Sequence, residues 1–157
     1  MTGFEPFLAT VLSEAGQEAR RDGSATIEAQ HLLLAIAAQD EPTTTRVLAA
    51  VGLDHERVRA ALDREFERSL AGAGAAVAAG PSSPRPGSPP IGASVKLAME
   101  RGLGSTRRKR DLRPVHLLLG IVQAEVGTVP WALALAGVDP ADLADRIRQA
   151  LAVRDGD

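Results

Sequence analysis

Two histidines begin almost identical apolar stretches, and histidine is a common catalytic base and metal ligand. Residues 31–36 read His-Leu-Leu-Leu-Ala-Ile, and residues 116–121 read His-Leu-Leu-Leu-Gly-Ile. A serine hydrolase with a nucleophile elbow needs Gly-x-Ser-x-Gly, and a zinc site needs ligands at fixed spacing. Neither pattern occurs, and no carboxylates are paired for acid–base work. We therefore predict that His31 and His116 are structural residues bonded to neighbouring loops, and that the protein is not an enzyme and has no metal or cofactor.

The densest run of charge is basic and precedes the second histidine motif. It comprises Arg107, Arg108, Lys109 and Arg110, with Arg113 close behind. Such a run can bind nucleic acid or an acidic partner, or it can be a solvated loop between helices. A formal net charge of -2 and the lack of aromatic residues within the run disfavour nucleic acid. The solvated loop is the favoured interpretation, and a partner surface is the functional one.

Charge is distributed unequally along the chain. Residues 1–70 hold seven basic and twelve acidic residues, whereas residues 91–157 hold ten basic and eight acidic residues. The two ends therefore offer different surfaces to a partner. Trp131, the only tryptophan, is expected either to pack near a helix start or to anchor a partner.

The composition favours an all-α protein, because alanine and leucine dominate and only three Phe and one Trp supply aromatic surface. Five of the ten prolines fall in residues 71–90, among glycines and serines. Proline removes backbone donors and glycine raises the entropic cost of order, so this stretch is predicted to be a linker. It separates residues 1–70 from residues 91–157.

The two sides of this linker resemble each other at an offset of 85 positions. Beyond the histidine motifs, the identities at this offset pair Thr43 with Thr128, Ala49 with Ala134, Gly52 with Gly137, and Asp54 with Asp139. The alignment needs no gap over about forty residues, so it predicts a tandem repeat whose two units pack as one domain.

Each unit is predicted to hold four helices. In the first unit they cover about residues 7–21, 29–38 and 43–51, and the fourth begins after Asp54 as N-cap. The spacing of Val58, Leu62 and Phe66 predicts the buried face of that fourth helix. The second unit copies this scheme, although glycines weaken its first helix.

A helix that opens on His-Leu-Leu-Leu, then a short helix that ends in Leu-x-x-x-Gly-Leu-Asp, then an amphipathic helix, resembles the Clp N-terminal domain. The resemblance covers both units, including Phe4, where the family pattern begins. It implies a pseudo-twofold pair of four-helix repeats that binds substrates and adaptors for the Clp unfoldases and does no chemistry. The phosphate-binding loop of the unfoldase ring, Gly-x4-Gly-Lys-Ser/Thr, does not occur in these residues. We expect either a free-standing domain or a piece of a longer chain.

The chain also departs from the family pattern. In one branch of the family, a glutamate before each histidine receives the guanidinium of phosphoarginine, but Gln30 and Val115 stand at these positions. Neither can form the charge-assisted bidentate pair, and Glu5, beside Phe4, would repel a phosphate. Phosphoarginine binding is therefore disfavoured. Phe4 remains from the groove that binds cyclic-peptide antibiotics in relatives.

We therefore predict a non-catalytic protein-binding module, acting as an adaptor, regulator or decoy in Clp-dependent proteolysis, with cyclic-peptide antibiotics as further ligands. The alternative is a nucleic-acid-binding regulator that uses residues 107–113. The predicted ligand-binding groove comprises Phe4, Glu5, Phe7, Gln30, His31, Val115 and His116. The predicted partner surface comprises the basic run, Arg113 and Trp131. No signal peptide and no apolar run of about 20 residues occurs, so a cytoplasmic protein without membrane contact is expected.

Overall fold

The structure, a computed structural model, describes residues 4–73, 89–104, 106, 108 and 111–154. Every regular element in this part of the chain is a helix, which confirms the all-α class. The helices are α1 (Phe4–Arg21), α2 (Ala29–Ala37), α3 (Pro42–Ala50), α4 (His55–Ala73), α5 (Ala93–Leu103), α6 (Pro114–Val122), α7 (Thr128–Leu135) and α8 (Pro140–Arg154).

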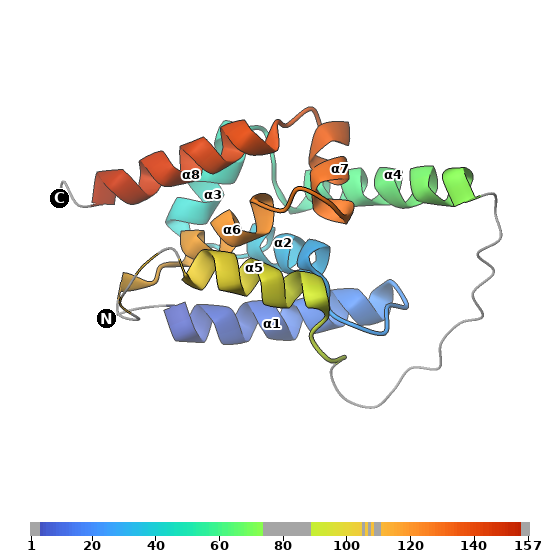
Figure 1. The fold of residues 1–157 in the computed structure, drawn as a ribbon, viewed down its shortest axis with the longest axis horizontal. Coiled ribbons are helices and arrows are strands. Elements are labelled where there is room, and N and C mark those ends of the chain that lie inside the picture. The colour runs from blue at the N-terminus through green and yellow to red at the C-terminus, as the bar shows by residue number, and fades with distance from the viewer. Residues whose placement is uncertain (1–3, 74–88, 105, 107, 109–110, 155–157) are drawn as a thin grey trace.

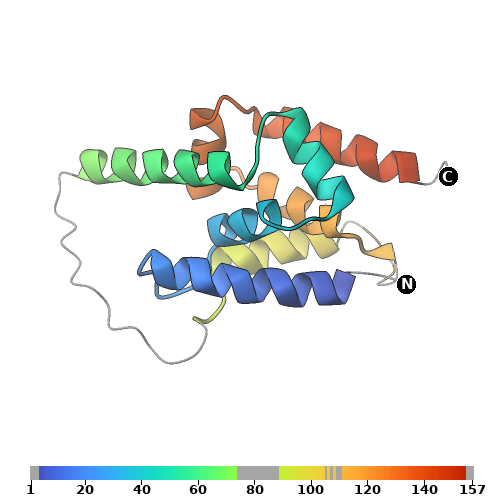
Figure 2. The same ribbon diagram turned by 180° about the vertical axis from the view of Figure 1, so that it is seen from behind.

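The helices form three layers (Figures 1 and 2). The short helices α2 and α6 lie in the middle, α1 and α5 lie on one side, and the other four helices lie on the opposite side. Every residue of α6 from Val115 to Val122 is buried, and in α2 every residue from His31 to Ile36 is buried. A helix that is apolar on all sides must be covered on all sides. The His-Leu-Leu-Leu motifs therefore build the centre of the molecule.

Contacts between the two halves of the chain come in reciprocal pairs. Helix α4 packs against α7, α3 packs against α8, and the two middle helices pack against each other. At the offset of 85 positions, α3 corresponds to α7 and α4 to α8, so each of these contacts maps onto another or onto itself. Buried residues from both halves belong to one hydrophobic core, and the duplication stays a prediction.

The ends of equivalent helices are built alike. Gly52 and Gly137 end α3 and α7 with φ of 78° and 80°, a backbone conformation that glycine adopts without steric cost. Asp54 Oδ1 then accepts a hydrogen bond from the Arg57 backbone N–H at 2.8 Å, which confirms the predicted cap. Asp139 Oδ1 accepts from the Ala141 N–H at 3.0 Å in the second half.

The predicted linker begins too early. Residues 71–73 belong to α4, which ends at Ala73, and residues 74–88 lie outside the described residues. Just before α5, Pro90 O accepts from Ile27 N–H and Gly92 N–H donates to Ile27 O, both at 2.8 Å. These two bonds fix the start of the second half against the turn that precedes α2.

A carboxylate reinforces this junction. Glu28 accepts hydrogen bonds from the hydroxyls of Thr26 and Ser94, the latter at 2.5 Å. Ser94 Oγ in turn accepts from the Ala29 N–H at 2.8 Å. Burial raises the pKa of Glu28, but the hydrogen bonds from Ser94 and Thr26 outweigh burial and hold that pKa below its ordinary value. The ionised form of Glu28 therefore ties α5 to the start of α2.

Two glycines let α5 and α6 approach closely. A Cβ added at Gly120 would overlap the carbonyl oxygen of Ala98, and one added at Gly102 would overlap the carbonyl oxygen of His116. The glycine that weakens the sequence-based prediction of α5 is therefore required by its packing. The equivalent pair in the first half, α1 and α2, has Ala35 where α6 has Gly120.

The prediction that Phe66 belongs to the buried face of α4 is wrong. The relative exposures of Val58, Leu62 and Phe66 are 2%, 9% and 61%. Each step of four residues turns about 40° past a full helical turn, so the third member has rotated out of the core. Glu65, at 7% exposure, continues the buried face in its place.

Candidate functional site

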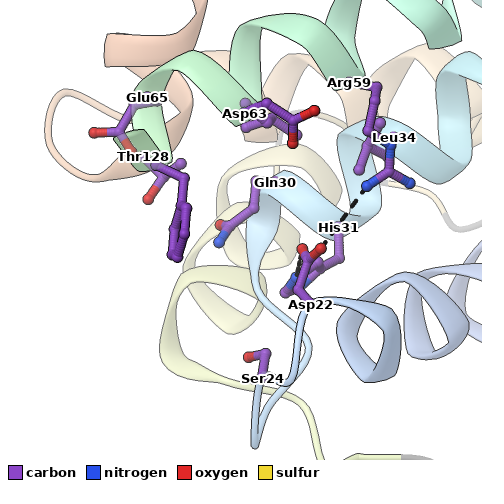
Figure 3. A pocket seen from close by; sticks show the side chains of 11 residues that line it. Asp22, Ser24, Gln30, His31, Leu34, Arg59, Asp63, Glu65 and Thr128 are labelled. Carbon is purple, nitrogen blue, oxygen red and sulfur yellow. Dashed lines mark hydrogen bonds and ion pairs between the residues drawn. The ribbon is translucent and has the colours of Figure 1, made fainter. Parts of the chain in front are cut away.

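A pocket of about 500 Å³ opens between the start of α2 and the side of α4. Figure 3 shows Asp22 and His31 on one side of it, and Arg59 and Asp63 from α4 on the other. Residues from both halves of the chain take part, because Thr128 begins α7. The lining consists of Asp22, Ser24, Gln30, His31, Leu34, Arg59, Leu62, Asp63, Glu65, Phe66 and Thr128.

His31 is held by hydrogen bonds on both ring nitrogens. Its Nδ1 accepts from the Glu28 backbone N–H at 2.9 Å, so Nε2 carries the proton and donates to Asp22 Oδ2 at 3.1 Å. The ring is 1% exposed. A general base needs a free lone pair directed at the substrate, and the Nδ1 lone pair is occupied by backbone. This geometry supports the structural role predicted for His31.

An ion network continues from His31 toward α4. Arg59 contacts Asp22 Oδ1 at 3.8 Å and forms a close ion pair with Glu18. His55 Nε2 lies 3.4 Å from Glu18 Oε2. Burial raises the pKa of Glu18, but Arg59, His55 and Arg21 outweigh burial and hold that pKa below its ordinary value. The guanidinium of Arg59 is thus occupied within the protein and is not free for a ligand.

The pocket carries an excess of negative charge. Asp63 is exposed, and no ion pair or side-chain hydrogen bond joins it to another described residue. Glu65 is buried and accepts a hydrogen bond from Ser69 Oγ at 3.0 Å, one turn along the same helix. Asp22, Asp63 and Glu65 thus give the pocket lining three carboxylates against the single guanidinium of Arg59, so the pocket favours a cationic ligand.

Apolar surface lies next to these charges. Phe66 is 61% exposed and lines the pocket beside Leu62. A second hollow, of about 220 Å³, shares Gln30 and Thr128 with the pocket. Leu97 and Val126, both exposed large apolar residues, line that hollow. The two hollows together expose apolar and charged groups on either side of Gln30, a combination that fits a protein segment better than a small polar ligand.

Only part of the predicted groove is present. Gln30 and His31 line the pocket, but Phe4, Val115 and His116 are buried in the core. Glu5 and Phe7 lie at the first turn of α1, whereas the pocket begins after its last turn. This helix is about 27 Å long, so its two ends cannot serve one small site. The inclusion of Phe4, Glu5, Phe7, Val115 and His116 in one groove with Gln30 is therefore not supported by the structure.

The predicted partner surface is also divided. Arg107, Lys109 and Arg110 lie outside the described residues, and Arg108 is exposed. Arg113 is half-buried and donates its backbone N–H to His116 Nδ1 at 2.8 Å, at the start of α6. Arg113 precedes the first residue of α6, whereas Trp131 lies on α7, which follows the last residue of α6. Trp131 contacts Arg68 of α4. Trp131 is 49% exposed, so it is not part of the core.

Sequence reasoning missed the α4 side of the pocket. The spacing of four from Leu62 predicts that Phe66 belongs to the core. Without an exposed Phe66 beside it, no pattern in the sequence singles out Asp63 as a site residue. A helical projection at 100° per residue places Asp63 and Phe66 about 60° apart, both outside the buried face. In the described part of the chain, no group of three or more His, Cys, Asp or Glu residues is placed to hold a metal ion. No described helix is long and apolar enough to cross a membrane.

The family model described as the Clp repeat N-terminal domain matches residues 4–102, from the start of α1 to the last turn of α5. A comparison with curated proteins found no match for the chain.

Proposed function

Because the chain belongs to the Clp repeat N-terminal domain family, we propose that it is a non-catalytic module that binds segments of other proteins in the pocket at Gln30. Domains of this family mediate interactions with Clp-related partners and substrates. The observation that carries the proposal is the juxtaposition of an exposed Phe66 with the unpaired carboxylate of Asp63. An apolar contact beside an uncompensated charge binds a side chain of opposite sign that is flanked by apolar residues.

The preferred segment is therefore basic and apolar. Gln30 offers an amide oxygen, but it lacks the charge of a carboxylate, so a cation is bound by the α4 carboxylates. A phosphorylated arginine would bring a dianionic phosphate toward Asp22, Asp63 and Glu65, and repulsion would weaken its binding. The preference predicted here is for unmodified arginine or lysine. Binding of cyclic-peptide antibiotics stays a prediction, and the buried Phe4 gives it no support.

A direct binding measurement tests this proposal. The basic probe is a short fluorescein-labelled peptide of alternating arginine and leucine, and the acidic probe has glutamate in place of arginine. We expect fluorescence anisotropy to show tighter binding of the basic probe. Asp63→Lys should weaken that binding about tenfold, because it replaces attraction by repulsion at an exposed site. Phe66→Ala should weaken it by a similar factor.

Glu67→Lys is the matched control, since Glu67 is an exposed carboxylate on the same helix that does not line the pocket. This substitution should leave the affinity for the basic probe within about twofold of wild type. Equal affinities of all three variants, or no binding of the basic probe, would refute the proposed site.

We further propose that the module acts as an adaptor, regulator or decoy in Clp-dependent proteolysis. A degradation assay with purified Clp unfoldase, Clp peptidase and a substrate that carries the basic probe sequence separates these roles. An adaptor accelerates degradation, whereas a decoy slows it in proportion to its concentration. An unchanged rate at saturating module would contradict both roles.

A further inference from the structure

The flank of α4 that faces away from the pocket carries a row of arginines. Arg57, Arg64 and Arg68 are seven and four residues apart, so at 100° per residue they lie within about 40° of one another around the helix. All three are exposed. Helix α7 crosses α4 at a steep angle and packs against it (Figure 2). Trp131, on α7, lies against Arg68. We name the surface formed by Arg57, Arg64, Arg68 and Trp131 the arginine ridge.

Contacts with α7 hold two of these side chains in place. The guanidinium of Arg68 lies 3.9 Å from the centre of the Trp131 ring, a cation–π arrangement. Arg64 Nη1 donates to the carbonyl oxygen of Leu135 at 3.4 Å. Arg57 and Arg64 also line a hollow of about 160 Å³ whose apolar walls come from Leu53, Ala60, Ala61, Leu135 and Ala136.

The positive charge of the arginine ridge is not compensated by ion pairs. Among the described residues, no ion pair joins a carboxylate to Arg57, Arg64 or Arg68, although Arg59 on the opposite flank is paired with Glu18 and Asp22. A guanidinium presents its donors in a planar fork that matches a carboxylate. Three such groups lie beside an exposed tryptophan and an apolar hollow, so the surface can bind carboxylates and apolar side chains together.

We propose that the arginine ridge docks a segment of a partner protein in which carboxylates flank an apolar side chain. The carboxylates pair with Arg57 and Arg64, and the apolar side chain enters the hollow between α4 and α7. Tryptophan and arginine are the residues that most often dominate the energetics of protein interfaces. Nucleic acid fits less well, because Arg68 covers one face of Trp131 and leaves less ring surface for base stacking.

This surface is separate from the pocket at Gln30. The two share no lining residue, and they lie on opposite flanks of α4 with opposite charge. One molecule can therefore hold a basic segment on one flank and an acidic segment on the other. Such an arrangement brings two proteins together, so it favours an adaptor over a decoy.

Trp131 provides a direct readout, because the chain has one tryptophan and no tyrosine. The experiment titrates the full chain with the unlabelled acidic probe and follows tryptophan emission. We expect a saturable change in emission that weakens as the salt concentration rises. Arg57→Glu with Arg64→Glu should weaken binding at least about tenfold, because two attractions become repulsions while Arg68 and Trp131 remain.

Arg46→Glu is the matched control. Arg46 is an exposed arginine on α3, at the position equivalent to Trp131, and it lies outside the ridge. The affinity of the Arg46→Glu variant for the acidic probe should equal that of wild type. No change in emission, equal losses in the control and ridge variants, or preferential ridge-dependent binding of a random DNA duplex would overturn the proposal.

Discussion

The ring of His31 accepts a hydrogen bond at Nδ1 from the backbone N–H of Glu28, three residues earlier, at 2.9 Å. His116 accepts the same bond from Arg113 at 2.8 Å. In each case the histidine satisfies the N–H of the residue that caps its own helix, as the third residue of a capping box does. The repeated histidine motif therefore encodes a self-capped helix that is buried at the centre of the fold.

This bond fixes the tautomer of both rings. Because Nδ1 accepts, we expect the neutral Nε2–H form at His31 and His116, which nitrogen chemical shifts of labelled histidine report. His31→Ala should lower the free energy of unfolding by about 1–3 kcal/mol, since it leaves the Glu28 N–H without its partner. An Nδ1–H tautomer at either histidine, or an unchanged urea midpoint for His31→Ala, would contradict this account.

Close packing of α5 on α6 predicts an asymmetry between the halves. Gly120→Ala should lower the free energy of unfolding by about 1–3 kcal/mol, because its Cβ would overlap the Ala98 carbonyl oxygen. The reciprocal change Ala35→Gly should cost only about 1 kcal/mol, through helix propensity. Urea unfolding of both variants tests whether Gly120→Ala loses more unfolding free energy than Ala35→Gly. A stabilised Gly120→Ala variant would show that α5 and α6 are further apart than described.

Acid should weaken the junction at Glu28. Its lowered pKa means that the folded state resists protonation, so its stabilisation is present above the ordinary carboxyl value of about 4.3 and is lost as pH falls through the lowered value. Glu28→Gln should cost about 1–2 kcal/mol at neutral pH. The difference from wild type should shrink as urea unfolding is repeated toward pH 3. A constant or widening difference would exclude this role for the carboxylate.

Exposure separates the stability effects of two neighbours on α4. Leu62→Ala should cost about 2–4 kcal/mol, because Leu62 is buried, whereas Phe66→Ala should change stability by less than about 0.5 kcal/mol. Thermal unfolding of the two variants is the measurement. If Phe66→Ala lowered stability as much as Leu62→Ala, Phe66 would belong to the core, and its proposed role in binding would be refuted.

Local signals in the sequence identified most of the fold. The caps at Asp54 and Asp139 and the turns at Gly52 and Gly137 were readable because each depends on a few adjacent residues. The buried middle helices are readable because the stretch that follows each histidine is apolar without interruption. The repeat at an offset of 85 positions accounts for the reciprocal contacts between the halves.

The site was less readable, because it depends on rotation and distance in three dimensions. Phe66 is four residues from Leu62, and only the accumulated turn of the helix shows that it leaves the core. Phe4 and Gln30 both belong to the family pattern, yet Phe4 begins α1, which is about 27 Å long, and Gln30 lies beyond its other end. The pairing of Trp131 with Arg68 joins α7 to α4, and no feature of the sequence predicts that contact.

The most direct test of the central claim is to map the bound basic probe on the isotopically labelled chain by backbone amide chemical shifts. We predict the largest shifts at Gln30, Asp63 and Phe66, with those at Trp131 unchanged. Asp63→Lys should abolish this pattern. Shifts centred on the arginine ridge, or spread evenly over the surface, would contradict the assignment of the pocket as the site that binds protein segments.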